Sequence, residues 1–197
     1  MRTTEPRTPP MDPTTSEADE VQLQHAVHQG DAYKAALQYM AEHVAQTGGM
    51  QAAGDYIVGY AIEDAEGMYV WTGGETTWRN PQVGNAHVEI AVCDAADGRF
   101  VPDLRITVEL VAPDGSVLGP YLHELMWHPM LYHYARDWDL PADGDYTLRV
   151  HIDPPHFLRH DEVNGRRYLE PVEVEFSGVR ISRGKESADP PSRTASA

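Results

Sequence analysis

Apolar residues alternate with polar or small residues in a series of short runs after residue 55. Side chains of a β-strand point alternately to its two faces, so each run predicts a strand with one apolar face. Turn signals separate the runs, among them Asp97-Gly98 and Asn164-Gly165. The runs include Tyr56 to Ile62, Val88 to Val92, Leu104 to Leu110, Tyr146 to Ile152 and Val172 to Phe176. At least six such strands with no helix between them predict an all-β fold, an antiparallel β-sandwich. The single cysteine, Cys93, excludes an internal disulfide.

The segment from Asp19 to Gly49 has a helical period instead. Tyr33, Leu37, Met40 and Val44 recur at helical spacing, Asp31 is a plausible N-cap, and Gly48-Gly49 is expected to end the helix. A shorter helix at about 19–28 carries His25 and His28, whose spacing permits chelation but is more often plain polar surface. Residues 1–18 and 183–197 are rich in Pro, Thr, Ser and charge and are predicted to be disordered tails. The predicted organisation is therefore tail 1–18, helical extension 19–49, β-sandwich domain 50–182 and tail 183–197.

The charge of the chain limits its partners. Asp and Glu number 31 against 15 Lys and Arg, a formal net charge of −16. Such a surface repels phosphate backbones, which argues against nucleic-acid or anionic-membrane binding and favours a cationic ligand. Adaptation to a high-salt host explains it equally well. No apolar run reaches the roughly 18 residues of a membrane span, and the first residues contain no apolar signal region. Taken literally, these features predict a soluble cytosolic chain unless a leader has been removed.

Two segments offer metal ligands. In the strand AHVEIAVC, His87 and Glu89 share the face opposite the apolar one, where i, i+2 side chains lie side by side; an ordinary solvated face is the alternative. The segment LMWHPMLYHYARDW brings Met126, His128 and His133 together with Met130, a thioether and imidazole set that suits copper. Its Pro129 prevents all four from pointing the same way, and a core edge rich in Met and aromatic residues is the alternative.

A third segment, PPHFLRHDEVNG, contains His156 and His160 in a predicted loop. Catalytic motifs are missing from the sequence: it has no Gly-rich phosphate loop, no Gly-x-Ser-x-Gly elbow and no His-Glu-x-x-His. The sequence therefore predicts a protein that is not an enzyme.

Taken in order, these segments resemble the bacterial iron-transport-associated periplasmic family of copper- and iron-binding proteins. The resemblance runs from about residue 55 to 181 and rests on five elements. These are HVE at 87–89, GRFVPDL at 98–104, Met126 seven residues before His133-Tyr134, GDYTLRVHIDPP at 144–155, and RHD at 159–161. The helical segment at 19–49 lies outside the family pattern.

The resemblance implies an immunoglobulin-like β-sandwich that binds copper and iron without catalysis. It implies one metal site built from His87, Glu89, Met126, His133 and His160, with His128, Met68 and Glu66 as further candidates. It also implies a homodimer with sites near the interface, service to a membrane iron permease, and a periplasmic location. Two alternatives stay open: a structural or interaction module whose histidines are incidental, and a redox role in which copper oxidises or reduces iron.

Overall fold

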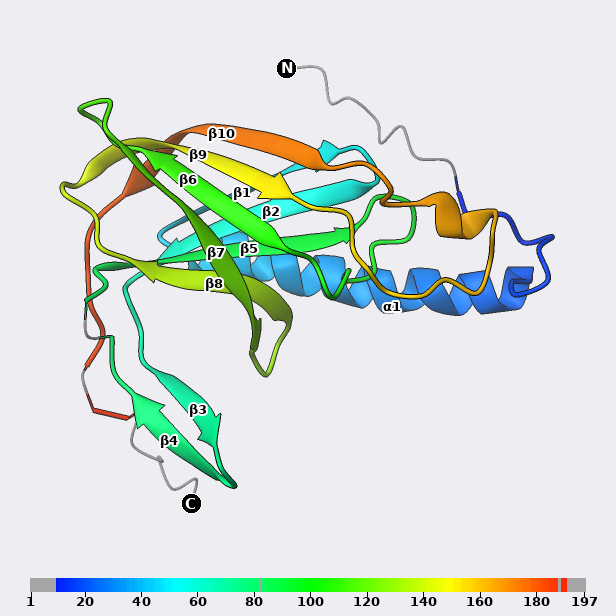
Figure 1. Ribbon diagram of the computed structural model, residues 1–197, viewed down its shortest axis with the longest axis horizontal. Coiled ribbons are helices and arrows are strands. Elements are labelled where there is room, and N and C mark those ends of the chain that lie inside the picture. Colours follow the sequence, from blue (N-terminus) through cyan, green and yellow to red (C-terminus); the bar gives the residue numbers. More distant parts are fainter. Residues whose placement is uncertain (1–9, 82, 188, 191–197) are drawn as a thin grey trace.

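The structure is a computed structural model and describes residues 10–81, 83–187 and 189–190. Its main feature is one antiparallel sheet of eight strands that folds into two layers, in the order β1-β2-β5-β8-β7-β6-β9-β10 (Figure 1). The strands are β1 (Thr47–Ala53), β2 (Tyr56–Glu63), β5 (Ala86–Asp94), β6 (Ile106–Val111), β7 (Val117–Trp127), β8 (Tyr132–Trp138), β9 (Gly144–Ile152) and β10 (Val172–Ile181). The expected all-β sandwich is confirmed. Its immunoglobulin-like character stays a prediction.

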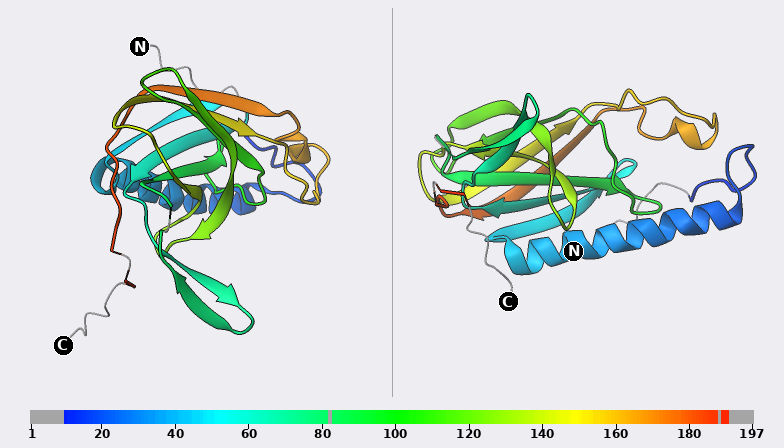
Figure 2. Two further views of the ribbon diagram at one scale, coloured as in Figure 1. Left: turned by 60° about the vertical axis from the view of Figure 1, so that its left-hand side comes forward. Right: turned by 90° about the horizontal axis from the view of Figure 1, so that it is seen from below.

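The first layer consists of β1, β2, β5 and β8 and the second of β6, β9 and β10, and strand β7 joins them. Its first part pairs with β6 and its last part, from Glu124 to Trp127, pairs with β8. The outer strands β1 and β10 approach each other, where the Gln51 side chain donates to the Glu175 carbonyl at 3.0 Å, so the sheet nearly closes on itself (Figure 2, left).

The core lies between the layers and consists of the inward positions that the alternation predicts. Val88, Ile90 and Val92 are fully buried there, facing residues such as Ile106 and Val150 from the other layer. Every residue of β5 is buried, however, including those on the opposite face. Strand β5 therefore has no solvated face. The alternative interpretation, in which His87 and Glu89 lie on an ordinary solvent-exposed strand face, is wrong.

Helix α1 (Glu20–Tyr39) lies along the first layer and continues into the π-helical turn η1 (Met40–Val44) (Figures 1 and 2). Leu37 and Met40 pack on Ala61 and Ala91, the outer face of β2 and β5. Because small side chains occupy that face, the helix can approach it closely and cover part of it. Burying these apolar groups fixes the helix to the sheet.

Two details of the helical prediction are wrong. Asp19, not Asp31, is the N-cap: its side chain accepts from the Gln22 amide in a capping box, and one helix runs through Gly30. A methyl group at Gly30 would overlap the Asp97 carbonyl, so this glycine serves a close contact rather than a break. Gly48-Gly49 does not end the helix but lies in β1, where Gly49 packs under the ring of Tyr60.

The remaining elements lie outside the sandwich. The hairpin of β3 (Met68–Thr72) and β4 (Glu75–Arg79) projects away from it (Figure 1), and the 3-10 turn η2 (Asn164–Arg166) lies in the loop between β9 and β10. Of the predicted tails, residues 1–9, 188 and 191–197 lie outside the described residues. In the described parts, Asp12 is hydrogen-bonded to Asn164, and Glu186 donates its amide to Ala65.

Candidate metal centre

Strands β5 and β8 place the predicted ligands side by side. His87 and Glu89 lie on the outer face of β5, and the β5–β8 register sets His87 opposite Asp137 and Glu89 opposite Ala135. On the other side of β5, Ala61 of β2 lies opposite Glu89. Two alanines therefore flank the glutamate, and their small side chains leave room for the imidazoles. His133, two residues before Ala135 on β8, points to the same face.

The side chains of His87, Glu89 and His133 converge. One ligand atom from each lies within 4.8 Å of the others, and all three residues are buried. Glu89 Oε1 is 3.3 Å from His133 Nε2 and 3.8 Å from His87 Nε2. Ligands of a tetrahedral ion at about 2.0–2.1 Å lie roughly 3.4 Å apart, so these separations suit a shared ion.

Several polar atoms of this cluster lack hydrogen bonds. Within the described part of the chain, His87 Nε2, Glu89 Oε2 and both ring nitrogens of His133 are buried without a hydrogen-bond partner, although Glu89 and Glu66 lie close by. Buried polar atoms are nearly always satisfied in folded proteins, and each exception calls for an explanation. A metal ion bound among them supplies one.

Burial changes the protonation of the cluster. It raises the pKa of Glu89 to about 8, against the opposing effect of the His87 charge, and lowers the pKa of His133 to about 4. For His87, burial lowers the pKa, but the hydrogen bond to Asp137 and the charges of Glu66 and Glu89 outweigh it, so the net shift is upward. A metal must therefore displace protons from His87 and Glu89 near neutral pH, whereas His133 is already neutral.

Three further candidates lie beside the cluster. Met126 is half-buried and directly opposite His133 in the β7–β8 register, so the two side chains share a face. Glu66 Oε1 is 3.2 Å from His87 Nε2. His128 is exposed, with its ring centroid 6.5 Å from that of His133, and its Nδ1 accepts from the Met130 amide.

Two candidates lie elsewhere. Met68 opens the projecting hairpin, opposite Arg79. His160 is exposed and lines a separate cavity of about 840 Å³ together with Asp94. Asp94 is seven residues from His87 along β5, roughly 23 Å. Within one chain His160 is therefore not among the converging ligands, and its role as a ligand stays a prediction.

Sequence reasoning missed Asp137, which contacts the cluster, and did not place His123. Asp137 Oδ1 is 2.8 Å from His87 Nδ1. His123 is buried, and its Nε2 accepts from Trp138 Nε1 at 3.3 Å; burial lowers its pKa to about 3. The period of two from His133 through Ala135 places Asp137 on the same face and was the available signal. His123 gave no such signal, because its position depends on how β7 crosses between the layers.

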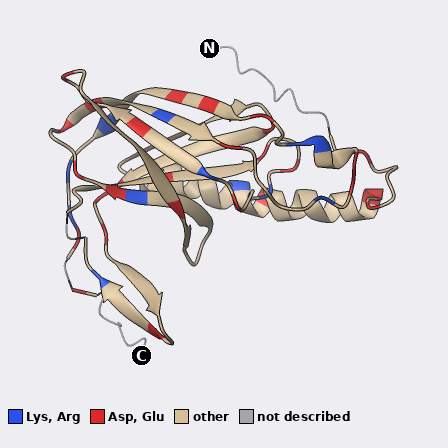
Figure 3. Cartoon of the chain, in the orientation of Figure 1, with Lys and Arg blue, Asp and Glu red and all other residues tan. Residues whose placement is uncertain are grey.

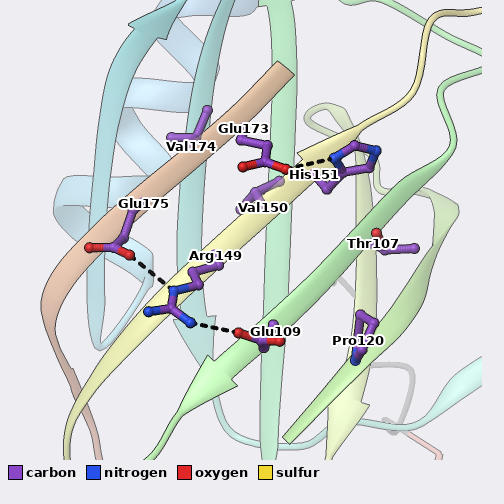
Figure 4. Close-up of a pocket in the computed structure, with 9 residues that line it drawn as sticks. All are labelled: Thr107, Glu109, Pro120, Arg149, Val150, His151, Glu173, Val174 and Glu175. Carbon is purple, nitrogen blue, oxygen red and sulfur yellow. Dashed lines mark hydrogen bonds and ion pairs between the residues drawn. The ribbon is translucent and has the colours of Figure 1, made fainter. Parts of the chain in front are cut away.

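Charges elsewhere on the chain are arranged differently. Acidic residues are spread over both layers and the loops (Figure 3). A groove of about 440 Å³ on the outer face of β6, β9 and β10 has Arg149 between Glu109 and Glu175, and His151 beside Glu173 (Figure 4). These groups pair with one another. Among the described residues, only His87, Glu89 and His133 form a converging group of three metal-ligating side chains.

No match to a curated protein was found. Among solved structures, the copper-reconstituted P19 protein from Campylobacter jejuni is 16% identical with a TM-score of 0.59, over 70% of this chain and 96% of P19. FetP from a uropathogenic Escherichia coli strain is 20% identical with a TM-score of 0.53, over 70% of this chain and 100% of FetP. At this level of identity the likeness establishes a shared fold. Residues 85–180 match the family model described as Fe2+ transport protein, a range that contains β5 to β9, nearly all of β10, and His87, Glu89 and His133. Through these residues the chain matches the Fe2+ transport protein family.

Proposed function

We propose that this protein binds copper, iron or both at the cluster of His87, Glu89 and His133, without catalysing a reaction, and serves iron acquisition. The observation that carries the proposal is the convergence of three buried side chains, each with a ligand atom within 4.8 Å of the others. Several polar atoms of these side chains have no hydrogen-bond partner in the described chain. The match of residues 85–180 to the Fe2+ transport protein family supports the role in iron transport.

The chemistry of the ligands fits both metals. Imidazoles from His87 and His133, with the Met126 thioether on the same face, suit copper in either oxidation state. Carboxylate oxygens from Glu89, and from Glu66 beside it, suit iron, which takes oxygen ligands more readily. The formal charge of −16 attracts either cation to the surface.

Partners and location rest on the resemblance. We propose a homodimer with sites near its interface, service to a membrane iron permease, and an extracytoplasmic location. The solved structure of FetP, which shares this fold, is of protein expressed in the periplasm. In such a dimer the second copy is one route by which His160 reaches the cluster. No helix among the described residues is long and apolar enough to span a bilayer.

Titration of copper(II) into metal-free protein at neutral pH tests the proposal. Wild type is expected to bind stoichiometrically, and His133→Ala to bind at least tenfold more weakly because it loses a buried ligand. His151→Ala is the matched control, since His151 is a partly exposed histidine on the other layer, already paired with Asp153 and Glu173. Equal affinity of wild type and His133→Ala would assign the cluster no metal and favour the interaction-module alternative.

His160→Ala tests the fifth predicted ligand. A loss of affinity in this variant would place His160 at the centre through a second copy or a loop movement. Sedimentation of the copper-loaded protein shows whether a dimer accompanies the effect. Glu89→Gln is titrated with iron(II) under anaerobic conditions and with copper(II). Because the Glu89 carboxylate suits iron better, the affinity of this variant for iron is expected to fall further below wild type than its affinity for copper.

A further inference from the structure

We propose that Asp137 is the positioning residue of this centre: one of its carboxylate oxygens orients His87 and holds Glu66 beside it. The inference rests on the proposed metal-binding function and adds a residue that touches the ligands but not the ion. It is carried by contacts on three separate segments, namely β8, β5 and the connection from β2 to the hairpin.

The first contact sets the orientation of the imidazole. Asp137 Oδ1 lies 2.8 Å from His87 Nδ1, and a carboxylate only accepts, so Nδ1 carries the proton. In neutral His87 the lone pair is then on Nε2, the atom that faces Glu66 and Glu89 and is buried without a hydrogen bond in the described chain. Ligating histidines typically use a carboxylate or carbonyl in this way to fix the tautomer and raise ligand basicity.

The second contact connects Glu66 to the same oxygen. The Glu66 amide donates to Asp137 Oδ1 at 3.4 Å, while the Glu66 carboxylate lies 3.2 Å from His87 Nε2. One oxygen of Asp137 therefore sets the relative position of an imidazole on β5 and a carboxylate in the connection from β2 to the hairpin. These two groups differ in metal preference, so their spacing affects which ion the centre accepts.

The surroundings of Asp137 leave it little freedom. A Cβ at Gly84 would lie 2.6 Å from the Asp137 Cβ and 3.2 Å from the Ala65 Cβ, so only glycine permits the observed packing. Ala65 is fully buried and is held by backbone hydrogen bonds to Gly184 and Glu186. The close approach of Gly84 thus restricts the Asp137 side chain, as the support of a group that positions ligands must.

The experiment compares wild type with Asp137→Asn and Asp139→Asn. Asp139 is exposed and two residues further along, so its variant makes the same change in charge without touching the cluster. Imidazole 15N shifts of metal-free protein at about pH 9 report the tautomer of His87. Copper(II) titration and EPR report the affinity and ligand field. Gly84→Ala is a further variant, which keeps the carboxylate but displaces it.

Wild type is expected to show the proton of His87 on Nδ1. Asp137→Asn is expected to mix the tautomers, raise the copper Kd roughly 10- to 100-fold and alter the EPR spectrum, with Gly84→Ala intermediate and Asp139→Asn unchanged. A wild-type proton on Nε2, or an unchanged tautomer and Kd in both Asp137→Asn and Gly84→Ala, overturns the inference. If no protein binds copper while the tautomer still follows Asp137, the proposed function fails and the positioning role stands.

Discussion

Replacing Glu89 with glutamine is expected to stabilise the metal-free protein at alkaline pH. Glu89 is 4% exposed, and its Oε2 has no hydrogen-bond partner in the described chain. Burial raises its pKa from an ordinary 4.5 to about 8. Because the folded state keeps this proton over a range in which the unfolded state has lost it, the free energy of unfolding falls as pH rises through that range. Glutamine has nearly the same shape and no proton to lose.

The size of the stability difference between Glu89→Gln and wild type follows from the pH range between the unfolded and folded pKa values of Glu89. A single group contributes about 1.4 kcal/mol per pH unit, so about 3.5 units between 4.5 and about 8 give up to roughly 5 kcal/mol. The difference in stability between Glu89→Gln and wild type is thus expected to be small near pH 4.5 and to grow until about pH 8. His133 and His123 act oppositely, because their lowered pKa values make wild type lose stability as pH falls below about 6.5.

Urea denaturation of chelator-treated protein at pH 5, 6.5 and 8.5 measures this difference. Glu124→Gln is the control, an exposed glutamate on β7 opposite Ala135, and should change stability by less than about 0.5 kcal/mol at every pH. If the stability of Glu89→Gln relative to wild type is the same at pH 5 and 8.5, the carboxylate is not desolvated as the structure indicates. A destabilised Glu89→Gln at pH 8.5 would refute the reasoning outright.

Three further predictions concern the helix and the proton–metal competition. Leu37→Ala should lower the free energy of unfolding by about 2–5 kcal/mol in urea, because Leu37 is 1% exposed against β2 and β5, whereas Val21→Ala at an exposed position should have little effect. Gly30→Ala should lower Tm despite the better helix propensity of alanine, since its methyl group overlaps the Asp97 carbonyl; an unchanged or higher Tm would show that the helix is free to move. Copper(II) affinity should rise between about pH 6.5 and 8, because the raised pKa values of His87 and Glu89 make protons compete there; calorimetry in several buffers would detect the released protons, and a flat profile would exclude these two ligands.

Local pattern was sufficient for much of the fold. The alternation along residues 86–94 predicts that Val88, Ile90 and Val92 face the core and that His87 and Glu89 share the other face, and the register confirms it. This works because the two faces of a strand follow from backbone geometry alone. The helical spacing of Leu37 and Met40 similarly predicts the contact face of α1, but the continuity of the helix through Gly30 depends on the Asp97 loop that it contacts.

The assembly of the centre was a matter of tertiary structure. The sequence determined that His87 and Glu89 lie together, and the family spacing predicts that Met126 and His133 belong with them. The pairing of β5 with β8 brings residues more than forty positions apart into one buried cluster, adds Asp137 and leaves His160 in another cavity. Strand neighbours and register come from long-range packing of whole layers, which no local period encodes. For that reason the chain itself specified the ligand types, whereas only the folded sheet decided which of them meet.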